Sequence, residues 1–175
     1  PPPWIRDILT KAVKVVPFTQ YGERKLKEWG LGNVDPAIWL GLDPTIWKPM
    51  DRRQMPQAMA SCGFREDAYN ILIVAANQTR KYLREQLEAI QLFQKTMPEA
   101  KPRLYLHTHL NPSGERALDL DLKELELESI SKIVDQYTLA CGGLPEEQMA
   151  SIFNCADVVL DCCLEGFGYS IVQSQ

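Results

Sequence analysis

The sequence predicts an α/β fold built on a parallel sheet with helices on both faces. Short apolar runs rich in β-branched residues alternate four times with longer amphipathic stretches, and no internal repeat interrupts the alternation. The run Ile71–Ala76 is apolar throughout, as in a strand that is buried on both faces. Because strands that alternate with helices usually lie parallel, with right-handed crossovers, we expect one parallel sheet.

The part of the chain after residue 70 carries the clearest elements. Tyr82–Met97 has apolar residues at a helical spacing and is followed by Pro98. Pro145–Cys155 predicts a helix with Pro in its first turn. The expected strands are Ile71–Ala76, Arg103–Thr108, one within Ile130–Tyr137, and Val158–Leu160; the other expected helices are Leu118–Leu127 and one that starts near Gly168.

The segment before residue 63 is less regular. Three prolines within residues 33–50 predict a linker. The other elements expected there are a strand at Val13–Val16, a helix at Gln20–Trp29, a short strand inside the linker and a helix at Arg52–Cys62.

Composition excludes several classes of protein. With 45% hydrophobic residues among 175, the chain is no disordered acidic tail, and its net charge of −4 gives no reason to expect nucleic acid as a partner. No apolar run approaches the roughly 20 residues that span a bilayer, and the N-terminus lacks the pattern of a secretory signal. Five cysteines without a C-x-x-C pair indicate structural thiols in a reducing compartment. We therefore expect a cytoplasmic protein.

No metal site is expected from the sequence. His107 and His109 lie two residues apart on an expected strand, hence on one face, but two ligands are too few for zinc. Asp119 and Asp121 have the spacing of a metal-binding pair, yet they fall at a helix start, where caps and solvated acids are common. We interpret the histidines as ordinary strand-end residues, with His107 also placed to line a cleft.

Open parallel sheets bind ligands beyond the carboxyl ends of their strands, and three segments fall at that edge. The first, Ala76–Lys81, follows the apolar strand and places Arg80 and Lys81 at the start of a helix. A guanidinium and an ammonium there could hold a diphosphate. The alternative is a solvated basic pair, but the helix dipole disfavours cations at this end, which favours the functional interpretation.

The other two segments are weaker signals. Gly142 and Gly143 precede the helix that begins with Pro; they would let the backbone approach a ligand closely, but they equally suit an ordinary turn. Glu165, followed by Gly166 and Gly168, could accept hydrogen bonds from sugar hydroxyls while the glycine amides meet phosphate oxygens. It could equally stabilise the dipole of the helix that follows.

Together, the three segments resemble the nucleotide-sugar-binding half of a retaining GT-B glycosyltransferase of family 4. ILIVAANQTRK (Ile71–Lys81) is similar to the first strand and phosphate-binding turn of that domain, and Leu104–Thr108 to its second strand. The block Gly142–Gly168 is the most specific part, with a helix, an Ala-Asp pair and a strand that leads to EGFG. The resemblance implies a truncated, Rossmann-like donor domain in residues 51–175. Residues 1–50 would be the tail of an N-terminal acceptor domain plus the interdomain linker, so the fold would be incomplete at both ends.

The resemblance also implies roles for residues. Lys81 matches the lysine on the donor diphosphate, and Arg80 could share that role. Glu165 matches the first glutamate of an E-x₇-E motif that contacts the transferred sugar; the second falls at Gln173, which keeps an acceptor oxygen without the charge. The catalytic residues are thus expected to be Glu165 and Lys81. The donor-binding residues are expected to be Arg80, Asn77, Gly142, Gly143, Gly166, Phe167, Gly168 and Gln173.

The implied reaction moves a hexose from a UDP- or GDP-linked donor to an acceptor, with retention of configuration. Charge grows on the departing diphosphate, and cations with helix amides would stabilise it, so neither a cofactor nor a metal is expected. A glycan, lipid or protein acceptor would bind the missing N-terminal domain, and the full-length protein could associate peripherally with a membrane. We expect the fragment alone to have negligible transferase turnover.

Two alternatives stay open at this point. The chain could be a degenerate, non-catalytic GT-B-like interaction or regulatory module, which Gln173 and the absence of the family's usual arginine near Ala75 support. It could also be another GT-B enzyme, such as a nucleotide-sugar epimerase, which shares the architecture but not the EGFG block.

Overall fold

The computed structural model describes residues 2–162 and 168–174. These residues form two compact units, one that ends at Leu42 and one that begins at Asp43. Among the described helices, none combines the length and the apolar character that a membrane span requires.

The first unit contains two helices, α1 (Pro3–Lys11) and α2 (Gln20–Glu28). Helix α2 was expected, and the hydroxyl of Thr19 caps its start by accepting a hydrogen bond from the amide of Gly22 at 3.0 Å. Helix α1 was not expected, although Pro3 in its first turn is a known helix-start signal.

The predicted strand at Val13–Val16 is wrong. The structure has only an isolated parallel bridge there, between Val15 and Val34, and the same bridge is all that exists of the short strand expected inside the linker. A run of β-branched residues makes a strand only where a partner chain continues the ladder, and here the pairing stops after one residue.

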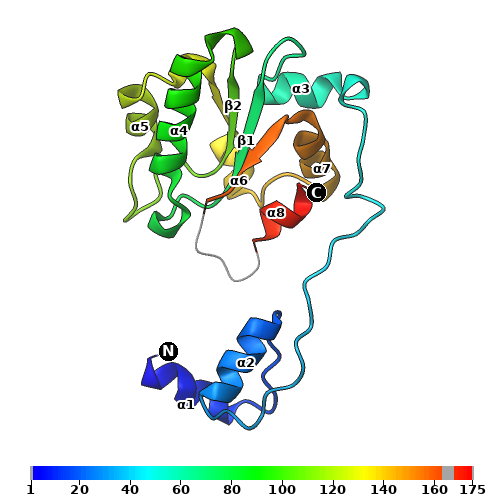
Figure 1. The fold of residues 1–175 in the computed structure, drawn as a ribbon, viewed down its shortest axis with the longest axis vertical. Coiled ribbons are helices and arrows are strands. Elements are labelled where there is room, and N and C mark those ends of the chain that lie inside the picture. The colour runs from blue at the N-terminus through cyan, green and yellow to red at the C-terminus, as the bar shows by residue number, and fades with distance from the viewer. Residues whose placement is uncertain (1, 163–167, 175) are drawn as a thin grey trace. The chain divides into compact units, whose positions relative to one another are not determined.

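The second unit is built on a four-stranded parallel sheet in the order β3-β2-β1-β4. Its strands confirm the four expected in this part of the chain, and the α/β fold class with them (Figure 1). The central strand β1 pairs on both sides, so that Leu72 lies opposite Tyr105 of β2 and Val159 of β4. The strands are β1 (Asn70–Val74), β2 (Arg103–His107), β3 (Ser131–Ile133) and β4 (Val158–Leu160).

Helices lie on both faces of this sheet, as expected. They are α3 (Pro56–Cys62), α4 (Leu83–Thr96), α5 (Leu118–Glu124), α6 (Gln136–Ala140), α7 (Glu146–Cys155) and α8 (Tyr169–Gln173). Short 3₁₀ turns lie at Arg52–Gln54, Thr79–Lys81, Pro98–Ala100 and Glu128–Ile130.

Two expected helices are shorter than predicted. The helix expected at Arg52–Cys62 is a 3₁₀ turn followed by α3, because Pro56 has no amide hydrogen and starts a new helix. The helix expected at Leu118–Leu127 ends at Glu124, since Glu126 has a left-handed backbone with φ 58°.

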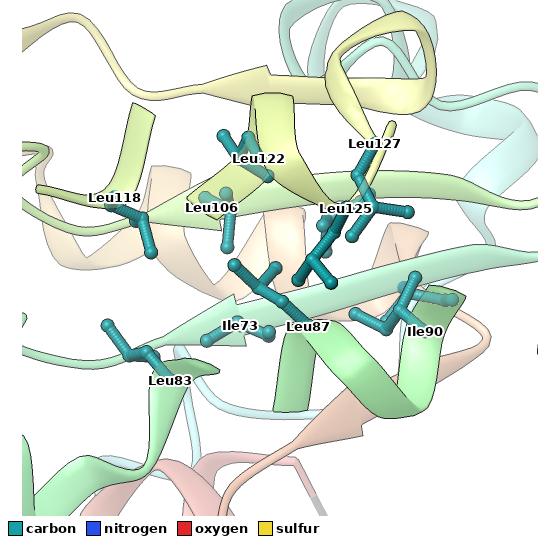
Figure 2. Close-up of a cluster of buried hydrophobic side chains, with 11 residues drawn as sticks. Ile73, Leu83, Leu87, Ile90, Leu106, Leu118, Leu122, Leu125 and Leu127 are labelled. Carbon is teal, nitrogen blue, oxygen red and sulfur yellow. The ribbon is translucent and has the colours of Figure 1, made fainter. Parts of the chain in front are cut away.

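One hydrophobic core lies between the sheet and the pair α4 and α5. Ile71 and Ile73 face it because alternate residues of a strand point to the same side. Leu87 and Ile90 of α4 and Leu122 of α5 close over them, as Figure 2 shows. Leu87 is 0% exposed, and burying such a side chain is worth roughly 1.5–3 kcal/mol, so this face holds the layers together.

A second core lies on the opposite face, under α3 and α7. Leu72 and Tyr105 of the sheet pack there against Phe153 of α7. The end of the expected linker joins this core: the ring of Trp47 packs edge-on against Phe153 with centroids 5.3 Å apart, and the amide of Met50 donates to the Asn154 side chain at 2.7 Å. Residues 47–50 are therefore held against α7.

Candidate functional site

The strand order marks the edge of the sheet at which a ligand site is expected. From β1 the chain moves outward through β2 to β3 and then returns to the other side of β1 as β4 (Figure 1). All four strands are parallel, so their carboxyl ends meet at one edge. The strand order reverses at β1, because β2 and β3 lie on one side of it and β4 on the other, and open α/β sheets form a crevice for ligands at such a point.

The turn after β1 carries the two predicted cations. Thr79–Lys81 form a 3₁₀ turn, Tyr82 has a left-handed backbone with φ 49°, and α4 begins directly afterwards. Arg80 is exposed and Lys81 is half-buried. Within the described residues no side chain caps α4, so the amides of its first turn stay available to an anion.

Asn77 ties this turn to the loop after β2. Its side chain is 7% exposed, and its amide nitrogen donates to the carbonyl oxygens of Leu110 and Arg116, each at 3.0 Å. The carboxylate of Glu115, in the same loop, accepts from the amide and the hydroxyl of Thr79 at 3.0 and 2.9 Å. Both hydrogens of the Asn77 amide are thus used internally, and a contact between Asn77 and a donor stays a prediction.

Gln136 makes a similar tie between the segments that follow β2 and β3. Its amide nitrogen donates to the carbonyl oxygens of Thr108 and Val134, and its oxygen accepts from the amide of Leu110 at 3.0 Å. No sequence pattern pointed to Gln136, Glu115 or the ties they make, because each partner lies on a different loop.

His107 is the last residue of β2, and His109 lies beyond the strand and is exposed. The expectation that both lie on one strand is therefore wrong. The Nδ1 atom of His107 is buried and has no hydrogen-bond partner among the described residues, and burial lowers the pKa of this imidazole. Burial therefore favours the neutral form of His107 at the carboxyl edge of the sheet.

Gly142 and Gly143 lie between α6 and α7. Their φ angles are 106° and 83°, which only glycine adopts freely. Their amides donate to the carbonyl oxygens of Leu139 and Thr138 at the end of α6. This geometry supports the turn interpretation, and contact between these glycines and a donor stays a prediction.

The segment after β4 contains the most specific predicted residues. Glu165, Gly166 and Phe167 lie outside the described residues. Gly168 is buried with φ 72° and precedes α8, where Gln173 is half-buried.

The described flanks of this segment are tied together. The hydroxyl of Ser170 in α8 donates to the carboxylate of Asp161, directly after β4. Because β4 pairs with β1, Asp161 leaves the sheet on the strand next to the one that leads into the turn with Lys81.

The acidic pair at the start of α5 has a structural role. Asp121 is 1% exposed, and its carboxylate accepts from Arg84 at 2.6 Å and from Arg116 at 2.5 Å, so the expectation of a helix cap or a solvated acid is wrong for this residue. Asp119 accepts from the amide of Leu120. Among the described residues, no group of three or more His, Cys, Asp or Glu side chains is placed to hold a metal ion.

Solved structures share this fold. Sucrose-phosphate synthase from Thermosynechococcus elongatus matches 97% of this chain over 40% of its own length, with a TM-score of 0.73 and 20% identity. The C-terminal domain of a group 1 glycosyl transferase from Francisella tularensis matches 77% of this chain over 65% of its own, with a TM-score of 0.59 and 19% identity. HepE from Anabaena, solved with UDP and glucose, matches 98% of this chain over 44% of its own, with a TM-score of 0.71 and 15% identity.

These likenesses show the fold. The chain has the Rossmann-like architecture of the C-terminal domains of GT-B glycosyltransferases. The chain spans less than two thirds of the length of each of these three proteins. No protein-family model matches the chain, and no curated protein matches it in sequence.

Proposed function

We propose that the chain is the donor-binding part of a retaining glycosyltransferase of family 4. It would bind a UDP- or GDP-linked hexose for transfer to an acceptor held by another domain. The observation that carries this proposal is the turn with Arg80 and Lys81, which lies at the switch point of the sheet and directly before α4. The shared fold with HepE, a protein solved with UDP and glucose, supports a nucleotide sugar as the ligand.

The chemistry follows from charge. When the bond between the sugar and the diphosphate breaks, the leaving oxygen gains negative charge. The acceptor hydroxyl oxygen takes its place on the same face of the sugar and passes its proton to the departing diphosphate. The ammonium of Lys81, the guanidinium of Arg80 and the amides of α4 would stabilise that charge in a closed cleft. Glu165 would accept hydrogen bonds from the transferred sugar, and Gln173 would contact the ribose.

The remaining parts of the proposal concern the whole protein. An acceptor glycan, lipid or protein would bind an N-terminal domain, and this fragment alone would turn over negligibly. We place the protein in the cytoplasm, with peripheral membrane association of the full-length form. Cations and helix amides would replace a metal ion at the diphosphate, so donor affinity should be unchanged by EDTA.

Isothermal titration calorimetry with UDP-glucose and GDP-mannose tests donor binding. Lys81→Ala should weaken binding at least about tenfold, because it removes a charge-assisted hydrogen bond to the diphosphate. Lys95→Ala is the matched control: Lys95 is exposed near the other end of α4, so the same change of charge there should leave the affinity within about twofold.

The titration also distinguishes donor binding from the main alternative, a non-catalytic module. A correctly folded sample that binds neither nucleotide sugar would refute donor binding and favour the non-catalytic module. Gln173→Glu should tighten binding if Gln173 contacts the ribose, because a carboxylate is the stronger acceptor. Retention is tested in the full-length enzyme by NMR of the anomeric configuration of the first product.

A further inference from the structure

A cavity of about 980 Å³ lies on the α3 and α7 face of the sheet, beside the edge strand β3. Its walls come from α3, α6, α7, β3 and Tyr105 of β2, all in the second unit. None of the residues predicted to bind a donor lines it. Its size is within the range of roughly 300–1,000 Å³ that small-molecule sites occupy.

The cavity offers little net charge to a ligand. Its charged residues are Lys132 and Asp135, and the protein itself uses both. The ammonium of Lys132 donates to the carbonyl oxygen of Ala60 at 3.1 Å, at the end of α3. The carboxylate of Asp135 caps α6 by accepting from the amide and the hydroxyl of Thr138 at 2.8 and 2.9 Å. The opposite charges of Lys132 and Asp135 leave the lining with no net charge, so it offers no surplus of cations to a phosphate or a nucleotide.

Neutral hydrogen-bonding groups surround the cavity. The side-chain amides of Gln54, Gln57 and Gln148 line it, and among the described residues none of them is hydrogen-bonded. Ser61 and Ser151 donate to backbone carbonyls at 2.8 and 2.9 Å, which leaves their oxygens able to accept.

Tyr105 is the most informative member of the wall. It is 4% exposed, and no described residue hydrogen-bonds its hydroxyl. Because this hydroxyl lines the cavity and no described residue pairs with it, it can both donate to and accept from a ligand there. The rest of the floor is apolar, formed by Met55, Ile133, Val134, Leu144 and Ile152.

We propose that this cavity binds a neutral, polyhydroxylated ligand, namely the end of an uncharged oligosaccharide. A pyranose ring offers hydroxyls to the three glutamines and to Tyr105, and an apolar C–H face to the floor. The site is distinct from the edge that carries Lys81, and the proposal does not depend on donor binding.

The experiment is NMR titration of the ¹⁵N-labelled 175-residue chain with maltotriose, cellotriose and mannotriose. We expect saturable shifts for at least one trisaccharide at residues that line the cavity. Tyr105→Phe keeps the ring and should weaken this binding about threefold to tenfold, whereas Tyr21→Phe, on the first unit, should leave it unchanged. Gln148→Ala, at an exposed position of α7, gives the same test if Tyr105→Phe does not fold.

Three outcomes would overturn the proposal. One is the absence of saturable shifts with all three sugars in a folded sample. Another is shifts confined to the turn around Lys81, and the third is displacement of the sugar from the cavity residues by UDP. The first two leave donor binding, which calorimetry measures separately, free to hold or fail on its own.

Discussion

Substitution of Asn77 tests whether this residue holds two loops together or contacts the donor. The sequence suggested a donor contact, but the buried Asn77 amide donates to the carbonyls of Leu110 and Arg116. Asn77→Ala should therefore lower the free energy of unfolding and have little effect on donor binding. Asn77→Asp should lower it further, because its carboxylate would face the same two carbonyl oxygens without a hydrogen to donate.

The magnitude follows from the two lost hydrogen bonds. Each is worth about 0.5–1.5 kcal/mol net, so Asn77→Ala should cost about 1–3 kcal/mol. The Leu110 carbonyl also accepts from the amide of Leu118 at 3.0 Å, which places more of this cost on the Arg116 carbonyl. For a chain of this size, 2 kcal/mol lowers the melting temperature by about 4–8 °C.

The assay is urea denaturation followed by circular dichroism, with calorimetry of UDP-glucose on the same samples. The neighbouring Gln78→Ala is the control, because Gln78 is exposed and has no side-chain hydrogen bond among the described residues. Donor affinity of Asn77→Ala should stay within about threefold of the parent. An unchanged free energy of unfolding together with abolished donor binding would show that Asn77 contacts the ligand instead.

Three further predictions concern the core and its titratable groups. Leu87→Ala, in the core of Figure 2, should cost about 2–5 kcal/mol in urea denaturation, and a cost below about 1 kcal/mol would contradict the packing. Because burial lowers the pKa of His107, its neutral form stabilises the fold above the unfolded pKa near 6.5; this contribution is lost as the pH falls through the folded pKa. His107→Gln should therefore flatten the fall in unfolding free energy between about pH 7.5 and 5, and an equally steep fall would refute this. Burial also raises the pKa of the Cys62 thiol to about 12, so mass spectrometry after labelling with a maleimide should find exposed Cys141 modified and Cys62 protected until the chain unfolds; equal labelling would count against the buried position.

The sheet could be predicted because its signals are local. The continuous apolar run that became β1 and the helical spacing of α4 each describe an element that buries one or both faces. The failed strand at Val13–Val16 had the same β-branched composition, but a strand also needs a partner, and only Val34 pairs with it. Local composition cannot supply that information.

The site was predictable in part for the same reason. Once the strands are parallel, any segment that directly follows a strand starts at the carboxyl edge, and the turn with Arg80 and Lys81 does follow β1 there. The role of these residues in donor binding stays a prediction. The ties made by Asn77 reach carbonyl groups 33 and 39 residues away, and those made by Glu115 span a similar distance. No spacing in the sequence encodes such contacts.

The distribution of charge separates the two candidate sites by the ligand that each can take. At the carboxyl edge, two cations and the first amides of α4 gather where the backbone already favours an anion. In the cavity beside β3, the opposite charges of Lys132 and Asp135 leave no net charge, and amides and hydroxyls form the rest of the polar lining. A nucleotide sugar carries both an anionic diphosphate and an uncharged sugar, whereas UDP carries only the diphosphate. Binding of UDP should therefore depend on Lys81 and not on Tyr105. Binding of an uncharged sugar should depend on Tyr105 and not on Lys81, and the same four titrations with Lys81→Ala and Tyr105→Phe decide both.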